Sequence, residues 1–286
     1  MRVRLLALVS ALALSLLGAV PASATSEGHG YLALGDSVPF GFSPLLDPRN
    51  AANFVGYPEI VARGLNLADV NATCPGEATG GFLSLTGTDN LCRPYRSAVP
   101  LHVAYSTSQM AFALSYLRSH PGTRLVTLTL GANDAFRFQK DCKVGPTFGT
   151  CVLGLGGVAA TMQANLNLIF AQIRGTGYTG LIVAVTYYSL DYADTSGAVF
   201  LNGPMIAAAG AHGALVASGL DAWRATAVAA GGSSCVAGLL IRTSPTGCDV
   251  HPTPLGRDLL AGAVLATIAG SCPAHSLQGC LNRNRG

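Results

Sequence analysis

Charged side chains are scarce in this 286-residue chain. Asp, Glu, Lys and Arg make up 11% of the residues, the formal net charge is +3 at pH 7, and no basic cluster occurs. Nucleic acids and anionic membrane surfaces are bound through concentrated Lys and Arg. We therefore expect neither of them as a partner.

Three functional signatures are also missing. The chain has eight cysteines and six histidines but no C-x-x-C pair and no H-E-x-x-H segment, so it lacks the ligand spacings of the common zinc sites. The sequence G-x-S-x-G, which forms the nucleophile turn of α/β-hydrolases, does not occur either. These absences exclude the simplest metal-enzyme and α/β-hydrolase readings, and we expect no metal and no other cofactor.

The first 24 residues have the pattern of a secretory signal peptide. Arg2 and Arg4 precede an apolar run over residues 5–20, and Ala22-Ser23-Ala24 follows as a small-residue cleavage site. A membrane anchor is the rival interpretation, but about 16 apolar residues fall short of the ~20 that span a bilayer. We expect removal of residues 1–24, secretion of residues 25–286 to the extracellular space, and no integral membrane span.

Eight cysteines in an exported chain are typical of disulfides. The alternative is a catalytic cysteine. Many pairings exist for eight cysteines, and the simplest joins nearest neighbours: Cys74–Cys92, Cys142–Cys151, Cys235–Cys248 and Cys272–Cys280. Each pair would close a short loop, which the chain-entropy model values at about 3 kcal/mol.

Short apolar runs rich in β-formers alternate with helical stretches along the chain. We predict strands over residues 31–34, 67–71, 125–130, 181–186 and 215–217. We predict helices over residues 53–65, 107–118, 158–174 and 253–268, and a loop over about 136–151. This order is typical of a mostly parallel sheet with helices on both faces. Because no repeat or linker interrupts it, we expect one domain, a three-layer α/β/α sandwich.

Two motifs lie at the ends of predicted strands. Gly35-Asp36-Ser37 follows the first strand, and Gly131-Ala132-Asn133-Asp134 follows the most strongly apolar one. Ligands of open α/β sheets bind at the carboxyl ends of the strands. A serine there can act as a nucleophile, and an asparagine amide can donate to an oxyanion. Each motif alone is as typical of a helix cap or a turn.

His251 lies directly before a predicted helix start. Pro252-Thr253-Pro254 follows it, and Thr253 is a suitable N-cap with proline in the first turn. A turn at this place would present the imidazole to the crevice. The alternative is a surface or capping histidine.

In combination these residues resemble a known family. Ser37 near the start, Asn133 in the middle and His251 near the end resemble the ordered blocks of the SGNH (GDSL-like) hydrolases of the secreted bacterial type. Cys74-Pro75-Gly76-Glu77-Ala78-Thr79 resembles the glycine block of that family. The resemblance covers about residues 31–268 and implies a flavodoxin-like α/β/α fold.

The resemblance also implies the roles of the site residues. Ser37 would be the nucleophile and His251 its general base. The backbone amides of Ser37 and Gly76, together with the side chain of Asn133, would form the oxyanion hole. The reaction implied is hydrolysis of a carboxylic ester, by an esterase or lipase, through an acyl-serine intermediate.

The chain departs from the family pattern at the catalytic acid. The usual acid lies three residues before the histidine, where this chain has Cys248, and Asp249 lies two before. Some members of the family orient the histidine through a main-chain carbonyl instead. The sequence therefore leaves two candidates for this role, the Asp249 carboxylate and a backbone carbonyl.

The substrate class remains open at this level. Val38-Pro39-Phe40-Gly41-Phe42, beside the nucleophile, favours an apolar rim and a lipid or fatty-acyl ester, although aromatic residues after a strand more often pack in the core. The alternatives are a carbohydrate acetyl esterase and an exported binding protein of the same fold with decayed catalysis. We expect a monomer that acts on a small-molecule or lipid ester.

Overall fold

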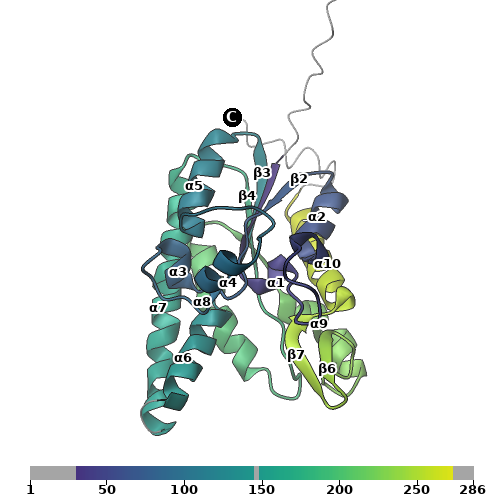
Figure 1. Cartoon of the computed structure of the whole chain (residues 1–286). Helices are drawn as coiled ribbons and strands as arrows, with labels where there is room; N and C mark the ends of the chain where they lie inside the picture. Colours follow the sequence, from purple (N-terminus) through teal and green to yellow (C-terminus); the bar gives the residue numbers. More distant parts are fainter. Residues whose placement is uncertain (1–29, 145–147, 273–286) are drawn as a thin grey trace, which may run out of the picture.

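The computed structural model describes residues 30–144 and 148–272. The predicted signal peptide, residues 1–24, and Cys280 of the last predicted disulfide lie outside these residues. The described chain is an α/β sandwich in which a central sheet separates two layers of helices (Figure 1).

The central sheet has five strands in the order β2-β1-β3-β4-β5, and every neighbouring pair is parallel. Its strands are β1 (Gly30–Gly35), β2 (Ala68–Asn71), β3 (Thr123–Thr129), β4 (Leu181–Val185) and β5 (Leu215–Ala217). All five lie where strands were predicted, which confirms the parallel α/β architecture.

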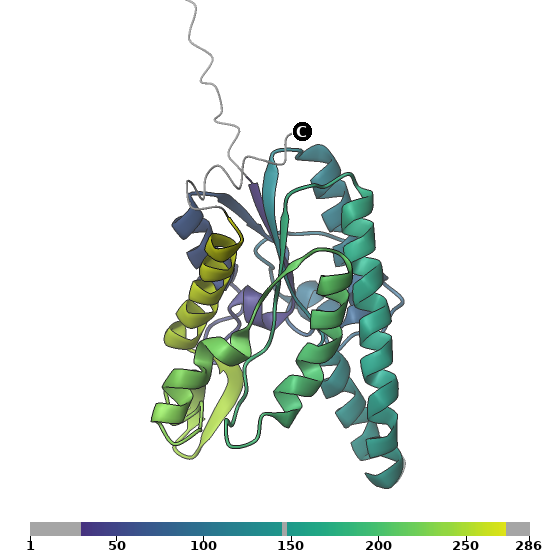
Figure 2. The same cartoon turned by 180° about the vertical axis from the view of Figure 1, so that it is seen from behind.

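The side chains of β1 alternate between the two layers, as strand geometry requires. Tyr31 and Ala33 pack in the core under α2 (Tyr57–Leu65), α9 (Gly219–Ala229) and α10 (Pro254–Ser271). Leu32 and Leu34 pack on the other face, under α5 (Gln109–Ser119), α7 (Phe148–Gly175) and α8 (Ser196–Ala211). The two helical layers are seen on either side of the sheet from behind (Figure 2).

The predicted loop over residues 136–151 is wrong. Residues Ala132–Val144 form helix α6, and α7 begins at Phe148. The polar composition of α6 and the glycines near the start of α7 conceal both helices in the sequence. Contacts of α7 with α6 and α8 supply the packing that these local propensities lack.

The sequence also missed a hairpin that matters for the site. Strands β6 (Leu240–Ser244) and β7 (Gly247–Pro252) pair antiparallel, outside the main sheet. The remaining short elements are α1 (Ser37–Phe40), a 3-10 turn at Ala51–Asn53, α3 (Thr79–Leu83) and α4 (Cys92–Ala98). Helices α8 and α9 occupy the Gly- and Ala-rich stretches for which no element was predicted.

Two of the expected disulfides are present in the described chain. Cys74 and Cys92 are joined with their Cα atoms 5.6 Å apart, and Cys235 and Cys248 with theirs 5.8 Å apart. Cys142 and Cys272 are also disulfide-bonded. The side chains of their expected partners, Cys151 and Cys280, lie outside the described part of the chain.

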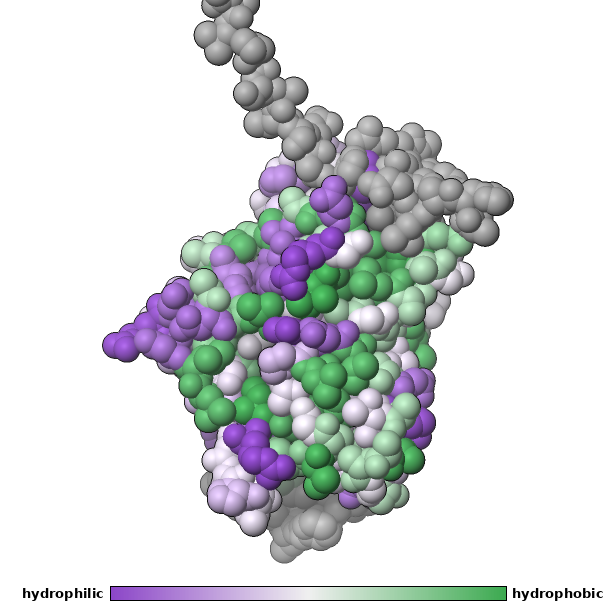
Figure 3. Space-filling view, turned by 90° about the vertical axis from the view of Figure 1, so that its right-hand side faces the viewer, coloured by the Kyte–Doolittle hydropathy of each residue, from purple (hydrophilic) through white to green (hydrophobic). Residues whose placement is uncertain are grey.

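Within residues 30–144 and 148–272, no helix combines the length and apolarity needed to cross a bilayer. Hydrophilic and hydrophobic residues are interspersed over the side that carries α2 and α10 (Figure 3).

Candidate active site

The carboxyl ends of the central strands meet at one rim, where the predicted site residues gather. Ser37 begins α1 directly after β1, and Asn133 lies in the first turn of α6 after β3. His251 lies near the end of β7. All three line a single cavity of about 610 Å³. The structure thus brings together residues that are far apart in the sequence.

Ser37, His251 and Asp249 form a continuous line of polar contacts. Nε2 of His251 lies 2.8 Å from Oγ of Ser37, and Nδ1 contacts a carboxylate oxygen of Asp249. The same oxygen accepts the backbone N–H of His251 at 3.0 Å. Because Nδ1 donates to a carboxylate, Nε2 is left to accept the serine hydroxyl proton. Of the two partners that the sequence left open, the carboxylate is the one in contact with the imidazole.

Asp249 is suited to remain ionised in this position. Its hydrogen bond with His251 lowers the pKa of the carboxyl below the ordinary value, against the opposing effect of partial burial. The Cys235–Cys248 disulfide anchors β7 one residue before Asp249. The acid therefore lies on a strand that is cross-linked to the segment before β6, rather than on a free loop.

Buried and half-buried aromatic side chains support the strand that carries His251. The hydroxyl of Tyr188 donates to the carbonyl of Val250 at 2.6 Å. The Tyr188 ring stacks on Trp223 with the centroids 3.7 Å apart, and Phe42 packs against the imidazole at 4.8 Å. Tyr188 lies two residues after the strand predicted over residues 181–186, but nothing in the sequence linked this tyrosine to the hairpin, which was not predicted.

The turn that carries Ser37 is packed too closely for a residue other than glycine at position 35. Gly35 has φ +132°, and a Cβ there would lie 2.0 Å from the carbonyl oxygen of Thr129 on β3. Next to it, Asp36 is buried and accepts the N–H of Val38 at 3.0 Å. Burial raises the pKa of Asp36 to about 6, although its hydrogen bonds oppose the shift.

One tyrosine hydroxyl joins the serine turn to the asparagine turn. Tyr187, which follows β4, donates to the second carboxylate oxygen of Asp36 and accepts the N–H of Ala132 at 3.1 Å. Its own backbone N–H and carbonyl are both bound by the side-chain amide of Asn202, each at 2.8 Å. Tyr187 thereby fixes the positions of Ser37 and Asn133 relative to each other, a role that the sequence did not reveal.

Three hydrogen-bond donors of the predicted site are available to a ligand. They are the backbone N–H groups of Ser37 and Gly76 and the side-chain amide of Asn133, none of which meets an acceptor among the described residues. Gly76 lies in the turn after β2 with φ +84°. Asn133 is 6% exposed and lines the cavity. Gly76 is not among the residues that line this cavity, so the oxyanion hole that the family resemblance implied stays a prediction.

The cavity beside the serine has mainly apolar walls. Phe136, Leu155, Leu190, Phe200 and Leu201 line it, with Asp191 and Asp194 among its polar residues. The expectation for residues 38–42 is correct only in part. Val38 lines the cavity, but Phe40 is fully buried against Phe54. The single turn of α1 directs Phe40 into the core, where such an aromatic side chain is most stable.

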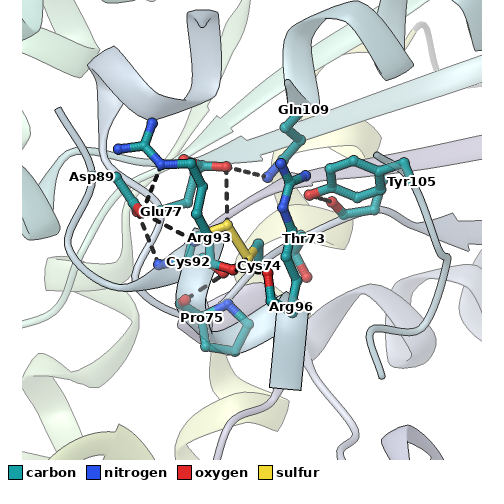
Figure 4. Close-up of a disulfide and its surroundings, with 12 residues drawn as sticks. Thr73, Cys74, Pro75, Glu77, Asp89, Cys92, Arg93, Arg96, Tyr105 and Gln109 are labelled. Carbon is teal, nitrogen blue, oxygen red and sulfur yellow. Dashed lines mark hydrogen bonds and ion pairs between the residues drawn. A yellow bond between two sulfur atoms is a disulfide. The ribbon is translucent and has the colours of Figure 1, made fainter. Parts of the chain in front are cut away.

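A second buried carboxyl lies behind the glycine turn. Figure 4 shows Glu77 beside the Cys74–Cys92 disulfide and the amide of Gln109, whose Nε2 lies 3.4 Å from Oε2 of Glu77. Glu77 is 3% exposed. Burial, reinforced by the charge of Asp89, raises the pKa of Glu77 to about 8. The two sulfurs are bonded to each other, so this cluster offers no thiolate to a metal.

We predict a pH-dependent stability difference between the wild type and Glu77→Gln. The folded pKa of about 8 lies above the ordinary value of 4.5, so the folded state binds this proton more tightly. Wild-type stability should fall as pH rises from about 4.5 to about 8, by at most ~1.4 kcal/mol per pH unit. The glutamine variant lacks this loss. Urea unfolding between pH 5 and 9 gives the free energy of unfolding of both proteins. A difference between the two free energies that does not change with pH would contradict the raised pKa of Glu77.

Comparisons with known proteins find similarity in structure only. No family model matches the chain, and no curated protein does. A phospholipase A1 from Streptomyces albidoflavus NA297 has a TM-score of 0.52 at 19% identity, covering 84% of this chain and 99% of its own. LAE5, an α/β hydrolase enzyme from the metagenome of Lake Arreo, has a TM-score of 0.51 at 18% identity. The match covers 89% of this chain and 97% of LAE5.

Carbohydrate esterases have the same architecture. A single-residue variant of Axe2, an acetyl xylan esterase from Geobacillus stearothermophilus, has a TM-score of 0.52 at 14% identity, and the match covers 84% of this chain and 94% of that one. Identities this low establish a common fold and not a common substrate. This chain has the α/β fold of these solved hydrolases, as its resemblance to the SGNH hydrolases implied.

Proposed function

We propose that the protein is a serine ester hydrolase of the SGNH type. The observation that carries the proposal is the contact of Ser37 Oγ with His251 Nε2 at 2.8 Å, with the Asp249 carboxylate on the other ring nitrogen. A serine, a histidine and an acid in this order are the parts of a nucleophilic acyl transfer. The N–H donors of Ser37, Gly76 and Asn133 would supply an oxyanion hole.

Acylation follows from these contacts. Oγ of Ser37 attacks the carbonyl carbon of the ester while Nε2 of His251 takes the hydroxyl proton. The carbonyl electrons move onto the oxygen, and the amides of Ser37, Gly76 and Asn133 stabilise that oxyanion. When the carbonyl re-forms, the bond to the alcohol oxygen breaks, and the imidazolium returns the proton to the leaving alcohol.

Deacylation repeats the same steps with water. His251 takes a proton from the water that attacks the acyl-serine ester, and the tetrahedral intermediate again places its charge in the oxyanion hole. Ser37 leaves as the protonated hydroxyl, and the acid product is released. The negative charge of Asp249 stabilises the imidazolium formed in each half-reaction.

A lipid or fatty-acyl ester is the substrate class that the cavity favours. An apolar cavity of about 610 Å³ beside the nucleophile suits an acyl chain, and it falls within the size range of ordinary ligand sites. A carbohydrate acetyl ester is the second candidate, because acetyl xylan esterases have the same fold. A decayed binding protein is disfavoured by the hydrogen-bond contacts of His251 with both Ser37 and Asp249.

We further propose that the enzyme acts outside the cell as a monomer. Export would follow from the signal peptide predicted over residues 1–24, and disulfides such as Cys74–Cys92 persist in oxidising compartments.

Ester hydrolysis by the mature chain tests the function. We expect serine-dependent turnover of p-nitrophenyl esters from acetate to palmitate, with a maximum at an acyl chain longer than acetate because the cavity walls are apolar. Ser37→Ala should abolish it, with an unchanged melting temperature as the control for folding. Turnover confined to acetate would support the sugar-ester candidate, and none across the series would argue against an enzyme.

Asp249→Asn measures the contribution of the carboxylate. Asparagine keeps the shape but removes the charge that favours the Nδ1–H tautomer and the imidazolium. We expect kcat to fall by about 10³–10⁴, the loss seen when a triad acid is neutralised. If the variant retains most of its activity, a backbone carbonyl orients the imidazole and the carboxylate is dispensable.

A further inference from the structure

The two separate halves of the proposed oxyanion hole are bridged by one residue, Asn90. Gly76 comes from the turn after β2, and Asn133 comes from the first turn of α6. The backbone N–H of Asn90 donates to the carbonyl of Gly76 at 3.1 Å. Its side-chain Nδ2 donates to Oδ1 of Asn133 at 2.9 Å. Asn90 itself is half-buried in the segment between Cys74 and Cys92.

The side-chain contact determines which end of the Asn133 amide faces the ligand. A primary amide carries one acceptor oxygen and one NH₂ donor as two separate arms of the same carbon. With Oδ1 of Asn133 bound to Asn90, its NH₂ group is the end left for the cavity that Asn133 lines. An amide turned the other way would present an oxygen to the oxyanion and repel it.

The backbone contact seats the glycine turn. A Cβ at Gly76 would lie 2.2 Å from the carbonyl oxygen of Asn90, and Gly76 has φ +84°. The backbones of Asn90 and Gly76 therefore touch directly, in addition to their hydrogen bond. The direction of the Gly76 N–H depends on this close fit.

The surroundings of Asn90 hold it rigidly. Asp89 accepts the N–H groups of Cys92 at 2.9 Å and Arg93 at 3.0 Å, and Cys92 is bonded to Cys74 (Figure 4). Leu91 has φ +84° although it is not glycine, and 58% of it is exposed. Such a backbone persists only where neighbouring contacts over-determine it, and it is often found beside functional residues.

We propose that Asn90 is a positioning residue of the oxyanion hole, which orients the Asn133 amide and seats Gly76, with the Cys74–Cys92 disulfide as its clamp. The proposal rests on the function proposed above. Asn90 acts through the two donors and does not touch the substrate. The oxyanion exists only after the serine has attacked, so the contribution of Asn90 belongs to the transition state and appears in kcat rather than in KM.

Kinetics of Asn90 variants on a p-nitrophenyl ester test the proposal. Removing an oxyanion donor outright, as in Asn133→Ala, costs about 10²–10³ in turnover. Asn90→Ala leaves the donor present but no longer oriented, so we expect kcat to fall by about 10- to 100-fold with KM nearly unchanged. Asn90→Asp keeps the shape without the NH₂ donor and should lose at least as much. Thr86→Ala, an exposed change in the same disulfide loop, is the matched control with wild-type kinetics.

The double variant separates positioning from general structural support. If Asn90 acts through Asn133, Asn90→Ala should cost far less in the Asn133→Ala background than in the wild type, because its main target is already gone. Equal losses of kcat in both backgrounds, or a rise in KM alone, would overturn the proposal. Melting temperatures of all variants identify any that fail to fold.

A measurement that needs no turnover keeps this proposal distinct from the proposed function. In ¹⁵N-labelled protein, the side-chain NH₂ signal of Asn133, identified by its loss in Asn133→Ala, should shift and broaden in Asn90→Ala and stay in place in Thr86→Ala. An unchanged signal in Asn90→Ala would overturn the positioning role, even in a fully active enzyme. If the Asn133 signal shifts in Asn90→Ala but the wild type hydrolyses no ester, the proposed function is refuted. The contact between Asn90 and Asn133 then still stands.

Discussion

The parallel pairing of β1 with β3 is the constraint on which the site depends. Gly35 pairs with Thr129, and the N–H of Asp36 donates to the carbonyl of Thr129 at 3.1 Å. Both strands end at this level, so the turns that carry Ser37 and Asn133 leave the sheet side by side. Only glycine at position 35 allows the two backbones to approach this closely. A shift of register would separate Ser37 from Asn133, the nucleophile and the oxyanion donor proposed above.

Disulfides and buried hydrogen bonds then fix the turns that the sheet brings to one edge. Tyr187 connects the serine turn to the asparagine turn, and Asn90 connects the asparagine to the glycine turn. One disulfide closes the segment with Asn90, and another joins the strand with His251 to the segment before β6. Preorganised donors of this kind stabilise developing charge without reorganisation during the reaction. The arrangement explains why a site gathered from distant segments can be rigid.

Much of this arrangement could be predicted from the sequence, and the failures have physical causes. The β-branched and apolar runs predicted all five central strands, and the ends of those strands predicted where Ser37 and Asn133 lie. The helix over Ala132–Val144 was missed because its stability comes from packing against α7 rather than from propensity. The β6–β7 hairpin, and with it the Asp249 contact, was missed although the Cys235–Cys248 disulfide was predicted, because β7 (Gly247–Pro252) has no apolar run that would indicate a strand. Asn90 carries no local signal at all.

Covalent labelling with a fluorophosphonate tests the central claim most directly, because it needs no knowledge of the natural substrate. An activated Ser37 attacks the phosphorus, fluoride leaves, and the adduct occupies the oxyanion hole as a mimic of the tetrahedral intermediate. The account predicts one adduct per chain, located by mass spectrometry on the peptide that contains Ser37, and greatly slowed labelling in His251→Ala. Labelling at another residue, or none in folded protein, would contradict it.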